Sequence, residues 1–294
     1  MNCTAAQVML KMKDFDIRYS NQADVPQIKN LMNSVFGDEE PFLNRFFNLF
    51  YQDNVLIVEA NNCIVSMAFL LPNNIMIQGQ LLPITYLYAC ATHAEYRGKG
   101  LMSRIIEKAY EDVCKRGEVG LILLPANESL YHYYENLGFK NSFFFDEILF
   151  SHKENIAPTK SSSFKIEKIT AETYFQLRNI TLTTELSILN PLQYFLLMET
   201  TPEEKELGFY LIYSQNEPIA ICYLSKSNSI LRVKELLPSD IDIPQLCSFL
   251  SHSFDVKQIG INIPGTTKKS AQIKLNSAYS NLEMEKGYFN FGLE

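Results

Sequence analysis

The residues best suited to chemistry lie in the run Tyr86–Ser103, which holds a glycine turn with two basic residues. Gly98 and Gly100 allow the backbone a left-handed conformation and a close approach to a ligand. Successive N–H groups in such a turn form a concave site for oxygen anions, and a helix that begins there adds its positive dipole end. Arg97 and Lys99 contribute formal positive charge. The run therefore predicts a binding site for a phosphate or pyrophosphate group.

Two common phosphate-binding motifs do not fit this turn. A P-loop requires G-x-x-x-x-G-K-[ST], whereas Lys99 stands between the glycines and no correctly spaced Ser or Thr follows. A dinucleotide-binding fold requires G-x-G-x-x-G after its first strand. Here Ser103 occupies the place of the third glycine, and the turn follows the fourth predicted strand. The turn belongs to neither class.

The elements that position the turn follow from hydrophobic periodicity and from turn residues. The predicted order is strand, helix, helix, three strands, helix, strand, helix, strand: Phe15–Tyr19, Val25–Val35, Glu40–Tyr51, Val55–Ala60, Cys63–Leu71, Leu81–Thr92, Leu101–Arg116, Val119–Leu124, Leu130–Leu137 and Ser142–Phe150. This order indicates an α/β (α+β) fold with a mixed, mostly antiparallel sheet flanked by helices. We expect the phenylalanines of the second helix to be core residues, with a substrate-cleft wall as the alternative.

The second half of the chain predicts a smaller copy of the first. Residues 153–163 are polar and rich in turn formers, so we expect a linker between a domain at 1–152 and another at 164–294. Gly208–Leu224 repeats the strand, asparagine turn and strand of Asn54–Phe69. The turn after the next strand, Leu237–Pro244, has no glycine and no basic residue. The second domain is therefore predicted to lack the anion site.

Composition limits the functional classes. The chain has 294 residues, 47% hydrophobic and 20% charged, and a net charge of −7, which disfavours nucleic acid and anionic membranes as partners. No apolar run approaches the length of a membrane span. Six scattered cysteines without a C-x-x-C pair, and four scattered histidines, predict neither a disulfide framework nor a metal site. We expect a cytoplasmic protein without a metal cofactor.

Two motifs in order resemble the GNAT superfamily of N-acetyltransferases. The segment from Arg97 to Met102 is similar to the R/Q-x-x-G-x-G/A signature whose loop binds the pyrophosphate of coenzyme A. The segment from Asn127 to Phe139 looks like the family's N-x-x-A-x-x-x-Y-x-x-x-G-F element. Met102 and Leu130 depart from the small residues of the two motifs, but neither change removes a backbone donor. The layout further resembles tandem GNAT proteins, with a degenerate second GNAT-like domain.

The resemblance implies a role for each matching residue. Tyr134 matches the tyrosine that protonates the departing thiolate, and His93 is a further candidate as base. The strand edge at Cys90 is expected to pair with the pantetheine arm, while the Cys90 thiol is expected to be a small buried hydrophobe and not a nucleophile. The expected coenzyme A contacts are Cys90, Ala91, Thr92, Arg97, Gly98, Lys99, Gly100, Leu101, Met102 and Asn127. Glu59, Glu95 and the carboxylate of Glu294 are weaker candidates.

Two functions of different classes follow. The first is an acetyl-CoA-dependent N-acetyltransferase in which a primary amine of a small molecule or a peptide attacks the thioester directly. The second is a non-catalytic acyl-CoA-binding or scaffold protein, because tandem folds often keep one copy for binding or assembly. The second domain is expected to wall the acceptor cleft or to form a homodimer. The presence of Tyr134 favours catalysis.

Overall fold

The computed structural model describes residues 15–151, 164–182, 186–199, 207–227, 230–282, 284 and 287–289. These residues divide by their contacts into two compact units. The first contains the described residues up to 74, together with 82–140 and 272–282. The second contains 75–81, the described residues from 141 to 271, and those after 282.

The first unit follows the predicted element order. Its elements are β1 (Asp16–Tyr19), α1 (Val25–Phe36), α2 (Glu40–Phe50), β2 (Val55–Ala60), β3 (Cys63–Ile77), β4 (Gln80–Thr92), α3 (Leu101–Lys115), β5 (Gly120–Leu123), α4 (Glu128–Glu135), β6 (Lys140–Asn141) and β15 (Gln272–Leu275). The tip of the β3–β4 hairpin belongs to the second unit. Short 3-10 helices precede α1 and α3, at Gln22–Asp24 and Ala94–Tyr96.

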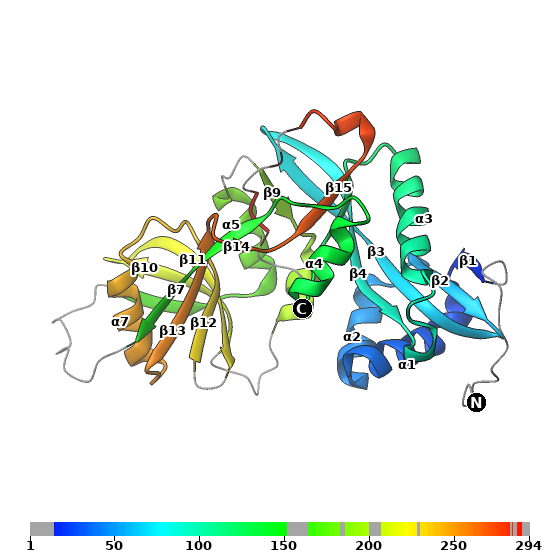
Figure 1. Ribbon diagram of the computed structural model, residues 1–294. Helices are drawn as coiled ribbons and strands as arrows, with labels where there is room; N and C mark the ends of the chain where they lie inside the picture. Colours follow the sequence, from blue (N-terminus) through cyan, green and yellow to red (C-terminus); the bar gives the residue numbers. More distant parts are fainter. Residues whose placement is uncertain are drawn as a thin grey trace. The chain divides into compact units, whose positions relative to one another are not determined.

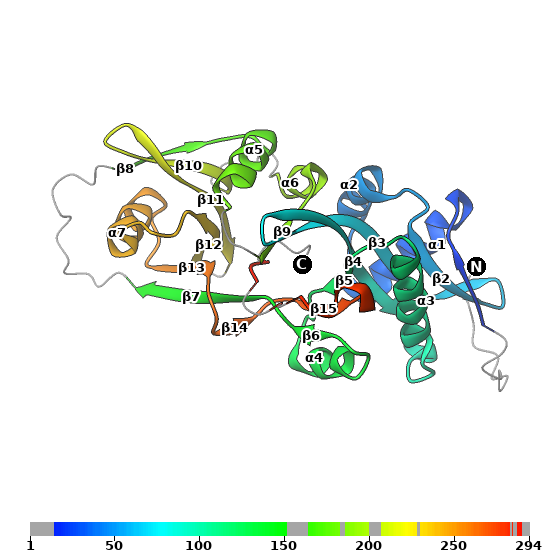
Figure 2. The same cartoon turned by 90° about the horizontal axis from the view of Figure 1, so that it is seen from above.

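The first sheet runs in the order β1-β2-β3-β4-β5-β15-β6. The β1–β2, β2–β3 and β5–β15 pairs are antiparallel, and β4–β5 is parallel. Figures 1 and 2 show α1 and α2 on one face of this sheet and α3 on the other. The mixed, mostly antiparallel sheet flanked by helices confirms the predicted fold class.

Aromatic residues fill the core on the α2 face. Phe46 is fully buried, with its ring centroid 5.0 Å from that of Phe69 on β3 and 5.1 Å from that of Tyr88 on β4. Phe47 and Phe50 are also buried. The expectation that the phenylalanines of α2 are core residues is confirmed for these three, whereas Phe42 is only partly buried. Apolar side chains of α3, including Ile105 and Ala109, pack on the opposite face.

The β2–β3 hairpin turns through Asn61 and Asn62, which both adopt a positive φ, of 52° and 61°. Two adjacent left-handed residues match the twist of the flanking strands, and asparagine tolerates that conformation. Gln215 and Asn216 repeat this geometry with φ of 51° and 69°. The predicted repeat of a strand, an asparagine turn and a strand is thus present at both places.

One strand of the first sheet comes from far along the sequence. β15 pairs with β5 from Leu275–Gly120 to Gln272–Leu123. A Cβ atom at Gly120 would overlap the backbone oxygen of Lys274, so only glycine permits this approach. Without β15, β5 would be an unprotected edge at this side. The sequence analysis did not predict this strand.

The second unit contains β7 (Phe144–Ser151), β8 (Phe164–Lys168), α5 (Ala171–Thr181), β9 (Leu186–Leu189), α6 (Leu192–Met198), β10 (Gly208–Ser214), β11 (Glu217–Ser227), β12 (Ile230–Leu237), α7 (Ile243–Ser253), β13 (Gln258–Pro264) and β14 (Lys268–Lys269). Its sheet runs in the order β14-β7-β13-β12-β11-β10-β8, with a parallel β12–β13 pair. β11 and β12 hold the positions in this sheet that β3 and β4 hold in the first sheet. The helix α7 follows β12 along the chain, as α3 follows β4. The α7 side chains Leu246 and Leu250 pack in the core of this unit.

Three expectations differ from the structure or fall outside its described part. The predicted strand Ser142–Phe150 was assigned to the first domain, but its main part, β7, pairs with β13 in the second sheet because Ile148 and Phe150 pack in that core. The predicted linker 153–163 and the C-terminal Glu294 lie outside the described residues. The domain boundaries therefore stay a prediction.

Cys63 is disulfide-bonded, whereas Cys90, Cys114, Cys222 and Cys247 are free thiols.

Candidate active site

The glycine turn links the end of β4 to the start of α3. Gly98 and Gly100 have φ of 73° and 72°, a left-handed conformation that is costly for residues with a Cβ. Gly100 is also the N-cap residue of α3, and no side chain caps this helix. The turn residues Arg97–Gly100 are exposed. The backbone at the helix start is therefore open to a ligand.

The first turn of α3 directs several N–H groups toward the same place. The intrahelical bonds begin with the N–H of Arg104, which donates to the Gly100 oxygen at 3.2 Å. The N–H groups of Leu101, Met102 and Ser103 precede it and have no acceptor within the helix. Together with the helix dipole they favour an anion. This geometry suits a phosphate or pyrophosphate group.

The two basic residues of the turn are held by neighbouring groups. Arg97 Nε donates to the backbone oxygen of Thr92 at 3.1 Å. The Lys99 ammonium lies 4.5 Å from the centroid of the Tyr96 ring, a cation–π contact. These contacts keep both positive charges beside the turn. The structure thus brings the predicted anion-binding residues together.

β4 and β5 separate directly before this turn. Their parallel register covers Thr85–Leu121 and Tyr86–Ile122, while β4 continues to Thr92. Ala89 adopts a φ of 49° inside β4, which marks a local irregularity of the strand. The segment from Cys90 to Thr92 therefore extends beyond the β5 pairing. A flexible thioester arm could pair with a strand edge of this kind.

The end of β4 is anchored from the β3 side. The Ser66 hydroxyl of β3 donates to the Ala91 oxygen at 3.0 Å and lies 2.8 Å from the Thr92 hydroxyl. The His93 N–H donates to the Val65 oxygen at 2.9 Å. These bonds hold the end of β4 on its β3 side. The other edge of β4 continues past its last pair with β5, and we call this place the strand opening. Sequence reasoning missed Ser66, because a serine inside an apolar strand has many possible partners.

Tyr134 reaches this opening from α4. Asn127 caps α4, and its side-chain oxygen accepts from the Leu130 N–H at 3.1 Å and from the Ser129 hydroxyl at 2.7 Å. The Tyr134 ring is 6% exposed and packs edge-on against Phe139, with centroids 5.7 Å apart. Helix capping and core packing therefore place Tyr134.

The Tyr134 phenol and the Cys90 thiol influence the pKa values of each other. Burial raises the pKa of the Tyr134 phenol well above its usual value, and the neighbouring Cys90 raises it further. Burial also raises the pKa of the Cys90 thiol to about 12, although the neighbouring Tyr134 acts in the opposite direction. Both groups therefore carry their protons at neutral pH.

The adjacent Tyr133 is placed differently. Its hydroxyl lies 3.0 Å from the Ser103 hydroxyl on the first turn of α3. Burial raises the pKa of Tyr133 as well. The two neighbouring tyrosines thus face different parts of the site, with Tyr134 at the strand opening and Tyr133 at the helix start.

His93 and Glu59 have local partners. His93 caps the short helix Ala94–Tyr96, and its Nδ1 accepts from the Glu95 N–H at 3.4 Å. Glu59 accepts from Arg18 Nη2 at 2.8 Å. A base function for His93 stays a prediction and would use the other ring nitrogen, Nε2.

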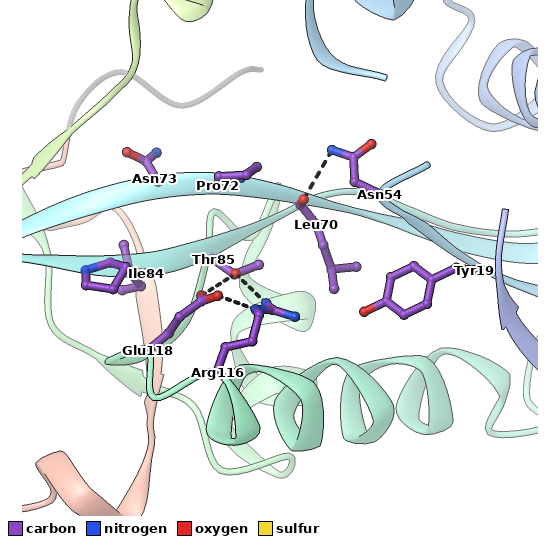
Figure 3. A pocket seen from close by; sticks show the side chains of 10 residues that line it. Tyr19, Asn54, Leu70, Pro72, Asn73, Ile84, Thr85, Arg116 and Glu118 are labelled. Atoms are coloured by element: carbon purple, nitrogen blue, oxygen red, sulfur yellow. Dashed lines mark hydrogen bonds and ion pairs between the residues drawn. The ribbon is translucent and has the colours of Figure 1, made fainter. Parts of the chain in front are cut away.

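A cavity of about 260 Å³ lies elsewhere in the first unit (Figure 3). Its lining includes Arg116, Glu118 and Thr85 near the C-terminal end of α3. The Thr85 hydroxyl donates to Glu118 at 2.6 Å, and Arg116 Nη2 donates to the Thr85 hydroxyl at 3.2 Å, so these polar groups bind one another. The 15 residues of α3 span about 22 Å. The cavity is therefore at the opposite end of α3 from the glycine turn.

The described residues also bear on metal binding and on membrane spans. No group of three or more histidine, cysteine, aspartate or glutamate side chains there is arranged to hold a metal ion. Among the helices of the described part, none combines the length and the apolar character that a membrane span needs.

The fold is shared with solved structures of low sequence identity. A probable N-acyltransferase from Enterococcus faecalis V583 matches with a TM-score of 0.73 and 14% identity, over 89% of this chain and 72% of that protein. A GCN5-related N-acetyltransferase from Anabaena variabilis matches with a TM-score of 0.67 and 15% identity, over 90% and 73%. Eis1 from Mycobacterium abscessus matches with 0.63 and 13%, over 90% and 74%. At these identities the likeness establishes the fold.

A family model provides the functional class. Residues 16–141 match the acetyltransferase (GNAT) domain. No curated protein matches the sequence. The matched range contains the glycine turn, the strand opening and Tyr134. The chain therefore contains, at residues 16–141, a segment that matches the acetyltransferase (GNAT) domain family.

Proposed function

We propose that this protein is an acetyl-CoA-dependent N-acetyltransferase that acetylates a primary amine of a small molecule or a peptide by direct attack. One observation supports the proposal: Tyr134 packs in one core cluster with Leu101 at the start of α3 and with Cys90, on the part of β4 that continues past its pairing with β5. In this proposal Tyr134 is a proton donor close to the strand edge and the anion site. The family match supports acyl transfer as the class of reaction.

The backbone of the turn binds the co-substrate in this proposal. The N–H groups between Gly98 and Ser103 hold the pyrophosphate, and Arg97 adds charge. The Cys90–Thr92 edge pairs with the pantetheine arm. Asn127, whose side-chain oxygen is used by the α4 cap, retains its amide N–H groups for a contact with the same ligand. Bound acetyl-CoA supplies the activated acetyl thioester.

Tyr134 acts as the general acid. At neutral pH its phenol is protonated because burial raises its pKa. The same surroundings raise the pKa of the Cys90 thiol to about 12, so a thiolate that leaves at this place is also a stronger base than in water. Burial therefore shifts the pKa of the donor and that of the acceptor in the same direction.

The acceptor amine must lose a proton before or during attack. His93 stands at the end of β4 and is our candidate base, through Nε2. The net charge of −7 is compatible with a cationic acceptor. The proposed acceptor is a primary amine of a small molecule or a peptide.

We also propose that the protein acts in the cytoplasm.

A free-thiol assay with acetyl-CoA and a panel of primary amines tests this function. Calorimetry with coenzyme A is run on the same preparation. The proposal predicts binding together with thiol release that requires an amine. Binding without turnover on small amines and on peptide amines would instead favour a non-catalytic acyl-CoA-binding protein. Failure to bind coenzyme A would contradict both functions.

A further inference from the structure

Two pairs of a serine hydroxyl and a tyrosine hydroxyl occur among the described residues of the first unit. The Ser103 hydroxyl, in the first turn of α3, lies 3.0 Å from the Tyr133 hydroxyl of α4. The Ser20 hydroxyl, directly after β1, lies 3.2 Å from the hydroxyl of Tyr51, the C-cap residue of α2. The chain thus contains the same chemical pair beside the glycine turn and elsewhere in the first unit.

Helix geometry directs the Ser103 side chain toward the glycine turn. Gly100 is the N-cap of α3, so Ser103 is the third residue of this helix. The Cα–Cβ bonds of an α-helix tilt toward its N-terminus. The N–H of Ser103 is one of those that have no acceptor within the helix. The backbone donor and the hydroxyl of this residue therefore both lie at the open end of α3.

The hydroxyl pair of Ser103 and Tyr133 has one proton more than its mutual bond uses. Each hydroxyl carries one proton and can accept as well as donate. Burial raises the pKa of the Tyr133 phenol, so this proton is retained at neutral pH. Within the described part of the chain, the 3.0 Å contact is the one side-chain hydrogen bond of either residue. Both side chains are only partly buried, so one O–H group remains for a ligand.

An anion at the glycine turn determines which hydroxyl supplies the remaining proton. If Ser103 donates to the anion, its oxygen can accept from Tyr133, and each hydrogen bond strengthens the other. In the opposite direction Ser103 would donate to Tyr133, and its own lone pairs would face the anion, which is repulsive. The favoured chain therefore runs from Tyr133 through Ser103 to the ligand.

We propose that the Ser103 hydroxyl donates a hydrogen bond to the pyrophosphate of coenzyme A, and that Tyr133 is the positioning residue that donates to Ser103. The inference rests on the proposed function, which assigns coenzyme A to this place. Ser103 thus adds a side-chain donor to the backbone donors of the turn. Neither hydroxyl takes part in the proton transfer from Tyr134, so the pair acts on affinity and not on the chemical step.

Calorimetric titration with coenzyme A measures the contribution of each hydroxyl. Ser103→Ala removes the donor, and we expect Kd to rise roughly tenfold, the effect of one hydrogen bond to a charged group. Tyr133→Phe leaves Ser103 without its support, and Kd should rise roughly threefold. The double variant should bind about as weakly as Ser103→Ala, because Tyr133 acts through Ser103. Ser103→Thr retains a hydroxyl and should restore most of the affinity.

The second pair provides the matched control. Tyr51→Phe breaks the hydrogen bond with Ser20 and should leave Kd for coenzyme A unchanged. Tyr19, the residue before Ser20, donates to Asp112 near the C-terminal end of α3 at 3.0 Å, so this pair lies away from the glycine turn. With an accepted amine, KM for acetyl-CoA in Ser103→Ala should rise by a larger factor than that by which kcat falls.

The outcomes separate this inference from the function on which it rests. A wild-type protein that binds no coenzyme A would contradict the proposed function, and with it the ligand of this inference. A wild type that binds coenzyme A equally well as Ser103→Ala overturns the inference alone. A loss in Ser103→Ala that Ser103→Thr does not reduce, as lost packing would cause, also overturns it. Additive losses in the double variant overturn the role of Tyr133.

Discussion

At the scale of single residues, burial sets the protonation of the candidate site. The Tyr134 phenol and the Cys90 thiol both lie where water is scarce, and both have a raised pKa for that reason. The exposed Arg97 has the opposite surroundings. The proposed proton donor and the proposed anion site therefore differ in polarity.

Reversal of the charge at Arg97 should weaken coenzyme A binding. Arg97→Glu replaces a cation beside the proposed pyrophosphate site by an anion, and we expect Kd to rise roughly tenfold or more. Lys115→Glu makes the same charge change at the far end of α3, where the side chain is 70% exposed. Calorimetry on both variants measures the difference. An equal effect of the two would show that only overall charge matters.

An ion pair at the start of the domain predicts a pH-dependent stability. Arg18 donates to both Asp24 oxygens, at 2.7 and 3.0 Å, and this bond lowers the pKa of Asp24 below its usual 3.8. A carboxyl with a lowered folded-state pKa stabilises the fold above pH 3.8, and this contribution is lost as the pH falls through the lowered value.

Asp24→Asn should therefore reduce the free energy of unfolding by about 1–2 kcal/mol at pH 7, where the partly exposed Arg18 limits the effect. The difference from wild type should shrink as the pH falls below 3.8. Urea unfolding at a series of pH values measures it. A difference that stays constant with pH would contradict the ion-pair explanation.

At the scale of secondary structure, α3 has a left-handed glycine at each end. Gly100 and Gly117 both have a φ of 72°, and a Cβ at either place would meet no atom within 4 Å. Replacement by alanine should therefore lower stability similarly, by about 1–2 kcal/mol, through backbone strain alone. Of the two glycines, only Gly100 lies at the proposed ligand site.

Gly100→Ala should weaken coenzyme A binding roughly tenfold, and Gly117→Ala should leave it unchanged. Thermal unfolding checks that the stability losses match, and calorimetry measures binding. Similar affinities for the two variants would argue against a cradle at the start of α3.

The sequence was sufficient for the elements of the site but not for all of its contacts. Glycines, asparagine turns and apolar periodicity act locally, so the order from β1 to α4 could be predicted. β15 could not, because a four-residue strand has no strong periodicity and its partner is far away in the chain. Gly120 was the available signal, since a glycine in a buried strand often marks a close backbone approach. The packing of Cys90 and Tyr134 at one core cluster brings together β4 and α4, which spacing in the sequence alone does not reveal.

At the scale of the whole molecule, the two units repeat a framework but differ at one helix start. The N-terminus of α7 corresponds in order to that of α3. There the Asp242 carboxylate accepts from the Gln245 N–H at 2.9 Å, and Pro244 lacks an N–H group. A side-chain anion thus occupies the place that a ligand anion would need. This supports the expectation that the second unit does not bind coenzyme A.

The chain should accordingly bind one coenzyme A and not two. Calorimetric titration of the full-length protein gives the stoichiometry. Arg97→Glu should weaken this single site and leave no second binding event. Two molecules bound per chain, or a site that persists in Arg97→Glu at the original affinity, would contradict the assignment of the cradle to the first unit.

The central claim is acetyl transfer to an amine with Tyr134 as the proton donor. The most direct test is kcat for thiol release from acetyl-CoA, measured with one accepted amine for Tyr134→Phe and for Tyr133→Phe. Because general acid catalysis contributes about 100-fold or more, we predict a kcat loss of that order in Tyr134→Phe with KM for acetyl-CoA nearly unchanged, and a much smaller loss in Tyr133→Phe. Equal rates in wild type and Tyr134→Phe would contradict the account.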